Sequence, residues 1–147
     1  MQQIYSLFES FGNSSKVWLY FADRRLTNEE VSICSADLNS FNNTWSAHGK
    51  KLHSGETILF NHVIVLVVDE NTETASGCSI DSSVHAIKKI GAKINVDFFN
   101  RLNVLTWNNG EVDIVPYSVI RKNKGLFYLN PLVSTLGELR ENWIIQS

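Results

Sequence analysis

The sequence has few of the residues and runs that mark several protein classes. Its longest apolar run, Val63 to Val68, is far shorter than the roughly 20 residues of a membrane-spanning helix. Its first residues lack the basic and apolar regions of a secretory signal peptide. Only two prolines occur and 44% of the 147 residues are hydrophobic, so no long disordered segment is expected. The sequence therefore predicts one globular domain over residues 1–147, located in the cytoplasm and not in a membrane.

Charge and cysteine are also scarce. A net charge of −2 gives no basic surface for nucleic acid or an anionic membrane, so neither is expected as a partner. The two cysteines, Cys34 and Cys78, predict reduced thiols in a chain without a secretion signal. The four histidines have no ligand spacing with cysteine, and no cofactor motif occurs. We therefore expect neither a metal nor a cofactor.

The first half of the chain predicts two strands and a helix between them. Residues 17–22 are rich in β-branched and aromatic types, and residues 57–69 are apolar on both faces, as in a central strand covered on both sides. Thr27 and Glu30 form a capping box that begins the helix. Its apolar face runs from Val31 through Cys34 and Trp45 to His48, with Gly49 at its end. Alternatively, the poor helix formers at 42–44 end it early and leave residues 45–49 as a separate turn.

The second half predicts a hairpin and two further helices. Asn108-Asn109-Gly110 separates strands at 102–107 and 111–115, and residues 116–123 form a short helix before a strand at 126–129. Asn130 and Pro131 are expected to begin a last helix with Leu132 on its apolar face. The fold class is therefore α+β, a single layer of mixed, largely antiparallel sheet with helices packed on it.

The segment SGCSIDSS, residues 76–83, follows the apolar strand and begins a helix. We expect Ser79 as its N-cap, Asp81 in its first turn and Gly77 at a positive φ. Cys78 would then lie just before a helix N-terminus, where the helix dipole and free N–H groups stabilise thiolate. The same groups, with Ser76, could hold an anion. The alternative is structural, with Cys78 packed as a small hydrophobic residue and the serines acting as ordinary caps.

Known cysteine chemistries do not fit this segment. A C-x-x-C motif needs cysteine at the position of Asp81, and a cysteine-phosphatase loop needs arginine at the position of Val84. His48 and Trp45 could supply a base and an aromatic wall if the fold brings them to Cys78. Arg101 is either a buried bidentate ligand for an anion or one half of a surface ion pair with Asp97.

Several segments resemble a small family of uncharacterised bacterial proteins from Bacteroidetes, and ASGCSID is the most specific of them. The other segments are VWLYFADRRLTNEE, WSAHGKKL, VVDENTETASGCSIDSSV and NRLNV. Family members are often labelled as ABC transporter ATPases. The label is unsupported here, because the chain has neither a GxxxxGK[ST] phosphate loop nor an LSGGQ-type signature. The resemblance implies no established activity.

Two functions follow from these patterns. In the first, the protein binds a small molecule or an anion at residues 76–83, with Cys78 as the reactive or contacting group; whether this contact is catalytic is left open. In the second, the motif is structural and the protein is a non-catalytic interaction module. Its possible partners include a second copy of the same chain, which would form a homo-oligomer. Exposed aromatic residues such as Trp107 or Phe127 would then mark the interface.

Overall fold

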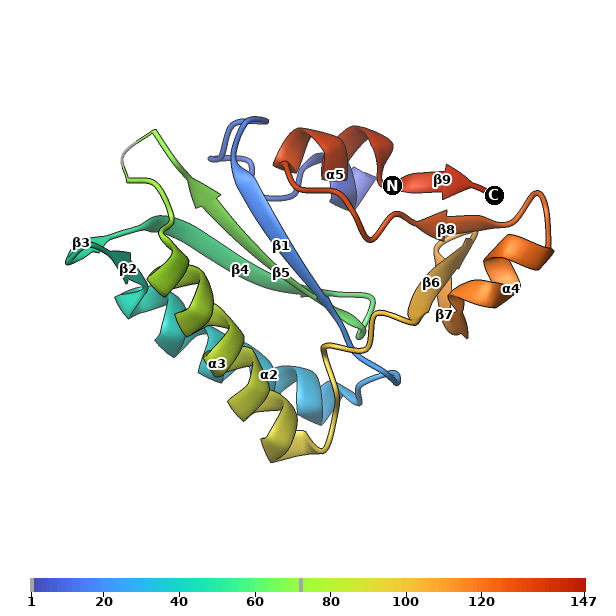
Figure 1. Cartoon of the computed structure of the whole chain (residues 1–147), viewed down its shortest axis with the longest axis horizontal. Helices are drawn as coiled ribbons and strands as arrows, with labels where there is room; N and C mark the ends of the chain where they lie inside the picture. The colour runs from blue at the N-terminus through green and yellow to red at the C-terminus, as the bar shows by residue number, and fades with distance from the viewer. Residues whose placement is uncertain (1, 72) are drawn as a thin grey trace.

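Strand β5 (Val63–Asp69) is the centre of the computed structural model, which describes residues 2–71 and 73–147 (Figure 1). It pairs antiparallel with β1 (Lys16–Phe21) on one side and β4 (His53–Leu59) on the other. Residues 63–68 are fully buried, and their side chains alternate between two separate hydrophobic cores. The prediction of a central strand covered on both faces is confirmed.

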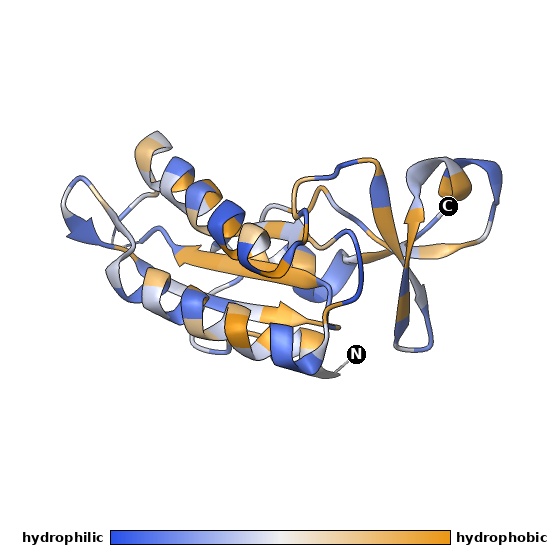
Figure 2. Ribbon diagram, turned by 90° about the horizontal axis from the view of Figure 1, so that it is seen from below, coloured by the Kyte–Doolittle hydropathy of each residue, from blue (hydrophilic) through white to orange (hydrophobic). Residues whose placement is uncertain are grey.

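Two long helices cover one face of this sheet. α2 (Asn28–Thr44) and α3 (Gly77–Ile94) lie side by side against Ile64, Leu66 and Val68 (Figure 1). Figure 2 shows both helices banded with hydrophilic and hydrophobic residues, as expected of helices with one buried side. Cys34 and Leu38 of α2 are completely buried in this core.

The opposite face of β5 packs against a second sheet and the last helix. Val63, Val65 and Val67 share a core with Leu105 and Trp143. Among the described residues the strands form three sheets with antiparallel pairing, which confirms an α+β fold with a largely antiparallel arrangement. The second sheet has the order β7-β6-β8-β9, and its strands are β6 (Asn103–Asn108), β7 (Glu111–Pro116), β8 (Phe127–Leu129) and β9 (Ile144–Gln146).

The predicted long strand over residues 57–69 is wrong: it is a hairpin of β4 and β5. Phe60 and Asn61 form its turn, with φ of 56° and 55°. Asn61 tolerates this left-handed conformation, and its amide donates to the Leu26 carbonyl at 3.0 Å. The hydropathy pattern did not indicate this turn, because Phe60 is as apolar as the strand residues before it. Its ring packs against Trp107 and Trp143, so tertiary contacts hold an aromatic residue in a turn.

Two predicted helix boundaries also need correction. α2 ends at Thr44, so the alternative of an early end is correct and Gly49 does not end the helix. Residues 46–51 instead form a small hairpin of β2 (Ser46–Ala47) and β3 (Lys50–Lys51). The last helix, α5 (Leu136–Asn142), begins at the cap Thr135 and not at Asn130. Leu132 therefore lies outside it and is 83% exposed.

The turn signals in the second half of the chain are confirmed. Asn109 and Gly110, with φ of 51° and 90°, join β6 to β7. α4 (Tyr117–Lys122) follows Pro116 directly. The short helix α1 (Gln2–Tyr5) lies against α5 (Figure 1). None of the described helices is long and apolar enough to cross a membrane.

The Arg24 side chain joins the start of α2 to the end of α3, through an ion pair with Glu30 and a hydrogen bond to Ile94. The Arg24 guanidinium donates to both carboxylate oxygens of Glu30, at 2.8 and 2.7 Å, and to the Ile94 carbonyl at 2.8 Å. Glu30 also accepts from the Thr27 N–H at 2.9 Å in the predicted capping box. These hydrogen bonds, first that of Arg24 and then that of Thr27, lower the pKa of Glu30 to about 2.

This pKa predicts an acid-dependent loss of stability. A carboxylate whose pKa falls on folding stabilises the fold above its unfolded pKa, and the contribution is lost as pH falls through about 2. We expect Glu30→Gln to flatten the dependence of the urea midpoint on pH between about 5 and 2, because glutamine keeps the capping geometry without titrating. Glu29→Gln, an exposed neighbour, is the control. Equal pH dependence in wild type and Glu30→Gln would contradict the prediction.

Candidate functional site

The segment 76–83 forms the rigid first turns of α3. Ser76 is the N-cap, and it exchanges hydrogen bonds with Ser79: the Ser79 N–H donates to Ser76 Oγ at 3.1 Å, and the Ser76 N–H donates to Ser79 Oγ at 2.7 Å. The prediction of Ser79 as N-cap is therefore wrong by three residues. Gly77 is the first helical residue and is not among those with positive φ, so that prediction is wrong too.

Cys78 is the second residue of α3 and is exposed to solvent. The N–H groups of Gly77 and Cys78 have no acceptor within the described residues, as is usual for a first helical turn. Asp81 is exposed but lies beyond the first turn, which contains no acidic residue. The thiol is thus presented at the positive end of a capped helix of 18 residues and is not packed inside it.

Trp45 holds this turn against the rest of the fold. Its indole Nε1–H donates to the Ser79 carbonyl at 2.8 Å, and the side chain is buried. The ring also contacts Trp18 and Phe41. The structure therefore brings Trp45 to the candidate segment as predicted, but as a buried support and not as the wall of an open pocket.

His48 does not lie on a helix. It is exposed in the turn between β2 and β3, where His48 and Gly49 have φ of 52° and 76°. The prediction that His48 lies at the buried edge of α2 is wrong, because the helix ends at Thr44. No hydrogen bond joins His48 to Cys78 in the part of the chain that the structure describes.

Arg101 is exposed and lies on another side of α3. Burial raises the pKa of Tyr20, and its hydrogen bond with Ser83 and then the charge of Arg101 oppose this rise, so Arg101 lies near Tyr20. Tyr20 Oη and Ser83 Oγ are 3.3 Å apart. Ser83 is five residues after Cys78, or about 140° around the helix. A buried bidentate role for Arg101 at the Cys78 turn is therefore wrong.

The second thiol differs from the first in its burial. Cys34 is completely buried in the core between α2 and the sheet, as predicted. Burial, followed by the negative charges of Asp37 and Glu30, raises the pKa of Cys34 to about 11. Cys34 is therefore an internal reference for an unreactive thiol.

The chain matches no protein-family model, no curated protein and no solved structure. Function is therefore inferred from geometry alone, and the resemblance of the ASGCSID segment to a Bacteroidetes family stays a prediction. Among residues 2–71 and 73–147, no group of three or more histidine, cysteine or acidic side chains is arranged to hold a metal ion.

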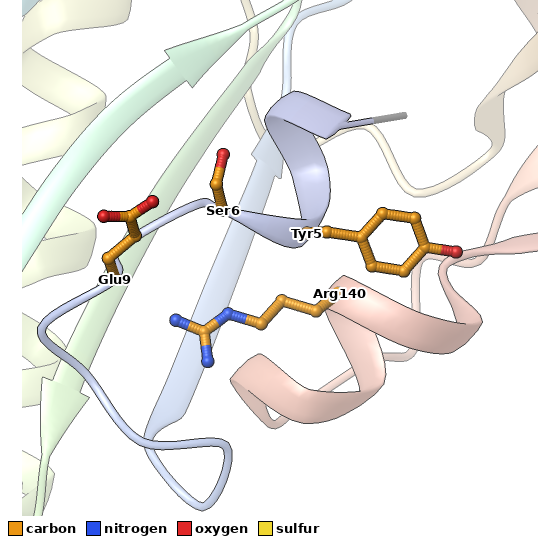
Figure 3. A pocket seen from close by; sticks show the side chains of 4 residues that line it. All are labelled: Tyr5, Ser6, Glu9 and Arg140. Carbon is orange, nitrogen blue, oxygen red and sulfur yellow. The ribbon is translucent and has the colours of Figure 1, made fainter.

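One hollow lies away from Cys78, between the N-terminal segment and α5 (Figure 3). Its volume is about 590 Å³, and Tyr5, Ser6, Glu9 and Arg140 line it. Arg140 extends from α5 beneath the N-terminal segment, and Tyr5 points away from its guanidinium. That guanidinium donates to backbone and amide oxygens, so it holds the chain together and has little capacity left for a ligand.

A further cavity, between the β4–β5 turn and the β6–β7 hairpin, was missed by the sequence analysis. It has a volume of about 370 Å³, and its lining comes from three separate stretches of chain around residues 25, 60 and 110–113. No motif connects these stretches. The sequence Asn108-Asn109-Gly110 predicted the β6–β7 hairpin. It could not predict that the tip of this hairpin lies opposite the β4–β5 turn.

Proposed function

We propose that the first turn of α3 binds a small molecule or anion at the protein surface, with Cys78 as the reactive or contacting group. One observation carries the proposal: of the two thiols, the exposed one lies at the second position of a capped helix, beside two unpaired N–H groups. Such N–H groups and the helix dipole stabilise thiolates and bound anions.

Rigidity of the turn supports the same proposal. The reciprocal Ser76–Ser79 bonds and the Trp45 hydrogen bond fix the backbone on both sides of Cys78. A residue whose backbone is already fixed loses less conformational freedom on contact with a ligand. Ser82 Oγ donates to the Cys78 carbonyl at 3.0 Å, which further holds the residue in the helix.

Alkylation with iodoacetamide, followed peptide by peptide by mass spectrometry at pH about 6.5, tests this function. We expect Cys78 to react about tenfold faster in the folded protein than in the urea-unfolded chain, because folding creates the helix terminus. Cys34 should show the opposite order, since its raised pKa and burial protect it in the folded state.

Ser76→Ala removes the cap and should slow labelling of Cys78, whereas Ser118→Ala, at an exposed site on α4, should not. Labelling of Cys78 that is no faster in the folded protein than in the unfolded chain would remove the case for chemistry at this turn.

A second candidate function is protein–protein interaction, favoured by exposed apolar side chains around α4. Leu102 is 76% exposed, Tyr117 is 43% exposed, and the Tyr117 N–H donates to the Leu102 carbonyl, so the two lie together. Phe127 is 48% exposed, as the interaction hypothesis expects. Trp107, in contrast, packs edge-on against Phe60 and is partly buried. Labelling of Cys78 that is no faster in the folded protein than in the unfolded chain would favour this second function.

A further inference from the structure

The cavity between the two hairpin tips is large enough for a small solute. Its volume of about 370 Å³ falls in the range of small-molecule sites, which begins near 300 Å³. Arg25 follows β1, Phe60 is in the β4–β5 turn, and Glu111 and Asp113 lie on β7. Gly110 and Val112 complete the lining.

Charges of both signs line this cavity without pairing. Among the described residues, ion pairs join Arg24 to Glu30, Lys93 to Asp37 and His53 to Asp69. Arg25, Glu111 and Asp113 take part in none of them, so no opposite charge of the described chain lies within 4.0 Å of these groups. A cation and two carboxylates that share a cavity but do not neutralise one another leave both charges available to a ligand.

A buried histidine ends the β4–β5 turn, two residues after the cavity residue Phe60. His62 is 3% exposed, and its Nδ1 has no hydrogen-bond partner among the described residues. Burial and then the charge of Arg25 lower the pKa of His62, while the Ala22 backbone and Asp113 raise it. His62 does not itself line the cavity, but it lies in the same turn as Phe60, which does. An unpaired buried polar atom is costly, and such atoms are often retained at functional sites.

The aromatic part of the lining is held in a strained conformation. Phe60 has a φ of 56°, a left-handed conformation that is unfavourable for a residue of this size. Ring contacts with Trp107 at 5.4 Å and Trp143 at 6.1 Å between centroids hold it there. The fold therefore presents a fixed apolar surface next to the three unpaired charged groups.

We infer that this cavity binds a small zwitterion, a molecule with an ammonium group and a carboxylate such as a free amino acid. Arg25 receives the carboxylate, Glu111 and Asp113 receive the ammonium group, and Phe60 contacts the carbon chain. A solute with a single charge would satisfy one side of the cavity and leave the other unpaired. This site is separate from the Cys78 turn, and neither proposal depends on the other.

Titration of the isotope-labelled full chain, followed by two-dimensional NMR at pH about 7 and constant ionic strength, tests the inference. The probes are glycine, β-alanine, 4-aminobutyrate and 6-aminohexanoate, with acetate and methylammonium as single-charge controls. We expect at least one zwitterion to shift the amides of Phe60, Gly110 and Glu111 saturably, with an affinity at least about tenfold higher than either control.

Matched variants assign the two ends of the ligand. Arg25→Gln and Asp113→Asn should each weaken zwitterion binding about tenfold or more, because each removes one charge partner. Arg121→Gln and Glu29→Gln, at exposed sites elsewhere, should leave it within about twofold.

Three results would overturn the inference. If acetate binds as tightly as the best zwitterion, the cavity is an anion site at Arg25. If methylammonium binds as tightly, it is a cation site at the carboxylates. If none of the zwitterions causes saturable shifts, the cavity is a solvated hollow that binds no zwitterion. If a variant fails to fold, the comparison of probes on the wild-type protein still decides the question.

Discussion

Arg140→Met is expected to destabilise the protein by about 2–4 kcal/mol, since hydrogen bonds from a charged group contribute about 1.5–3 kcal/mol each and are not additive. The guanidinium donates to the carbonyls of Leu7, Phe8 and Phe11, at 2.7 to 3.1 Å, and to Asn13 Oδ1 at 2.8 Å. It thereby fixes the N-terminal segment on α5. Methionine keeps the aliphatic packing but removes all of these side-chain hydrogen bonds, and urea unfolding measures the loss.

Arg140→Lys separates charge from geometry. A lysine ammonium is a compact point charge and cannot reach four oxygens that a planar guanidinium spans, so we expect it to recover less than half of the loss. Arg121→Met on α4 is the matched control and should change stability by less than about 0.5 kcal/mol. Hydrogen exchange gives a local readout. The amide of Phe11, bonded to the Phe8 carbonyl at 2.8 Å, should exchange faster when the Arg140 hydrogen bonds are removed. An Arg140→Met protein as stable as wild type would exclude this role.

Gly91→Ala is expected to destabilise the protein by about 1–3 kcal/mol, although alanine normally stabilises a helix by about 1 kcal/mol relative to glycine. A Cβ at position 91 would collide with the Val96 carbonyl oxygen and lie 3.4 Å from the Phe98 ring. The chain turns back on α3 at this point: Asn95 ends the helix with a φ of 57°, and the Val96 N–H donates to the Gly91 carbonyl at 2.9 Å.

Gly77→Ala at the other end of α3 is the matched control. An added Cβ there meets nothing within 4 Å, and the residue is helical, so we expect no loss and a gain of up to about 1 kcal/mol. Changes of opposite sign in the free energy of unfolding of the two variants, measured by heat or urea, would confirm that the close approach of the backbone, and not helix propensity, decides the effect at position 91. A stabilised Gly91→Ala protein would show that residues 95–98 can move away at little cost.

Local signals determined several elements correctly. The Thr27–Glu30 capping box, the Asn-Asn-Gly turn and the short helix after Pro116 each depend on hydrogen bonds or φ values of neighbouring residues. The apolar run of β5 also predicted its place between two cores, because a strand apolar on both faces must be covered on both. The helical spacing of apolar residues from Val31 onward predicted that Cys34 is buried, and this is confirmed.

Boundaries that depend on distant partners were not predictable. The turn at Phe60 depends on Trp107 and Trp143, and the first turn of α3 is supported by Trp45, all far away in sequence. The apolar pattern could not show that α2 ends at Thr44, because Trp45 is buried beyond the helix as well as it would be within it.

The sequence by itself determined the α+β class, the central strand and the burial of Cys34, because these follow from local hydrogen bonding and from hydrophobic periodicity. Only the tertiary structure decided which polar groups meet. Among the described residues it left His48 without a hydrogen bond to Cys78 and placed Arg101 near Tyr20, and it brought Arg25 to the cavity that Asp113 also lines. The reason is physical: periodicity tells which side of an element is buried, whereas meetings between side chains depend on turns and packing of segments far apart in the chain.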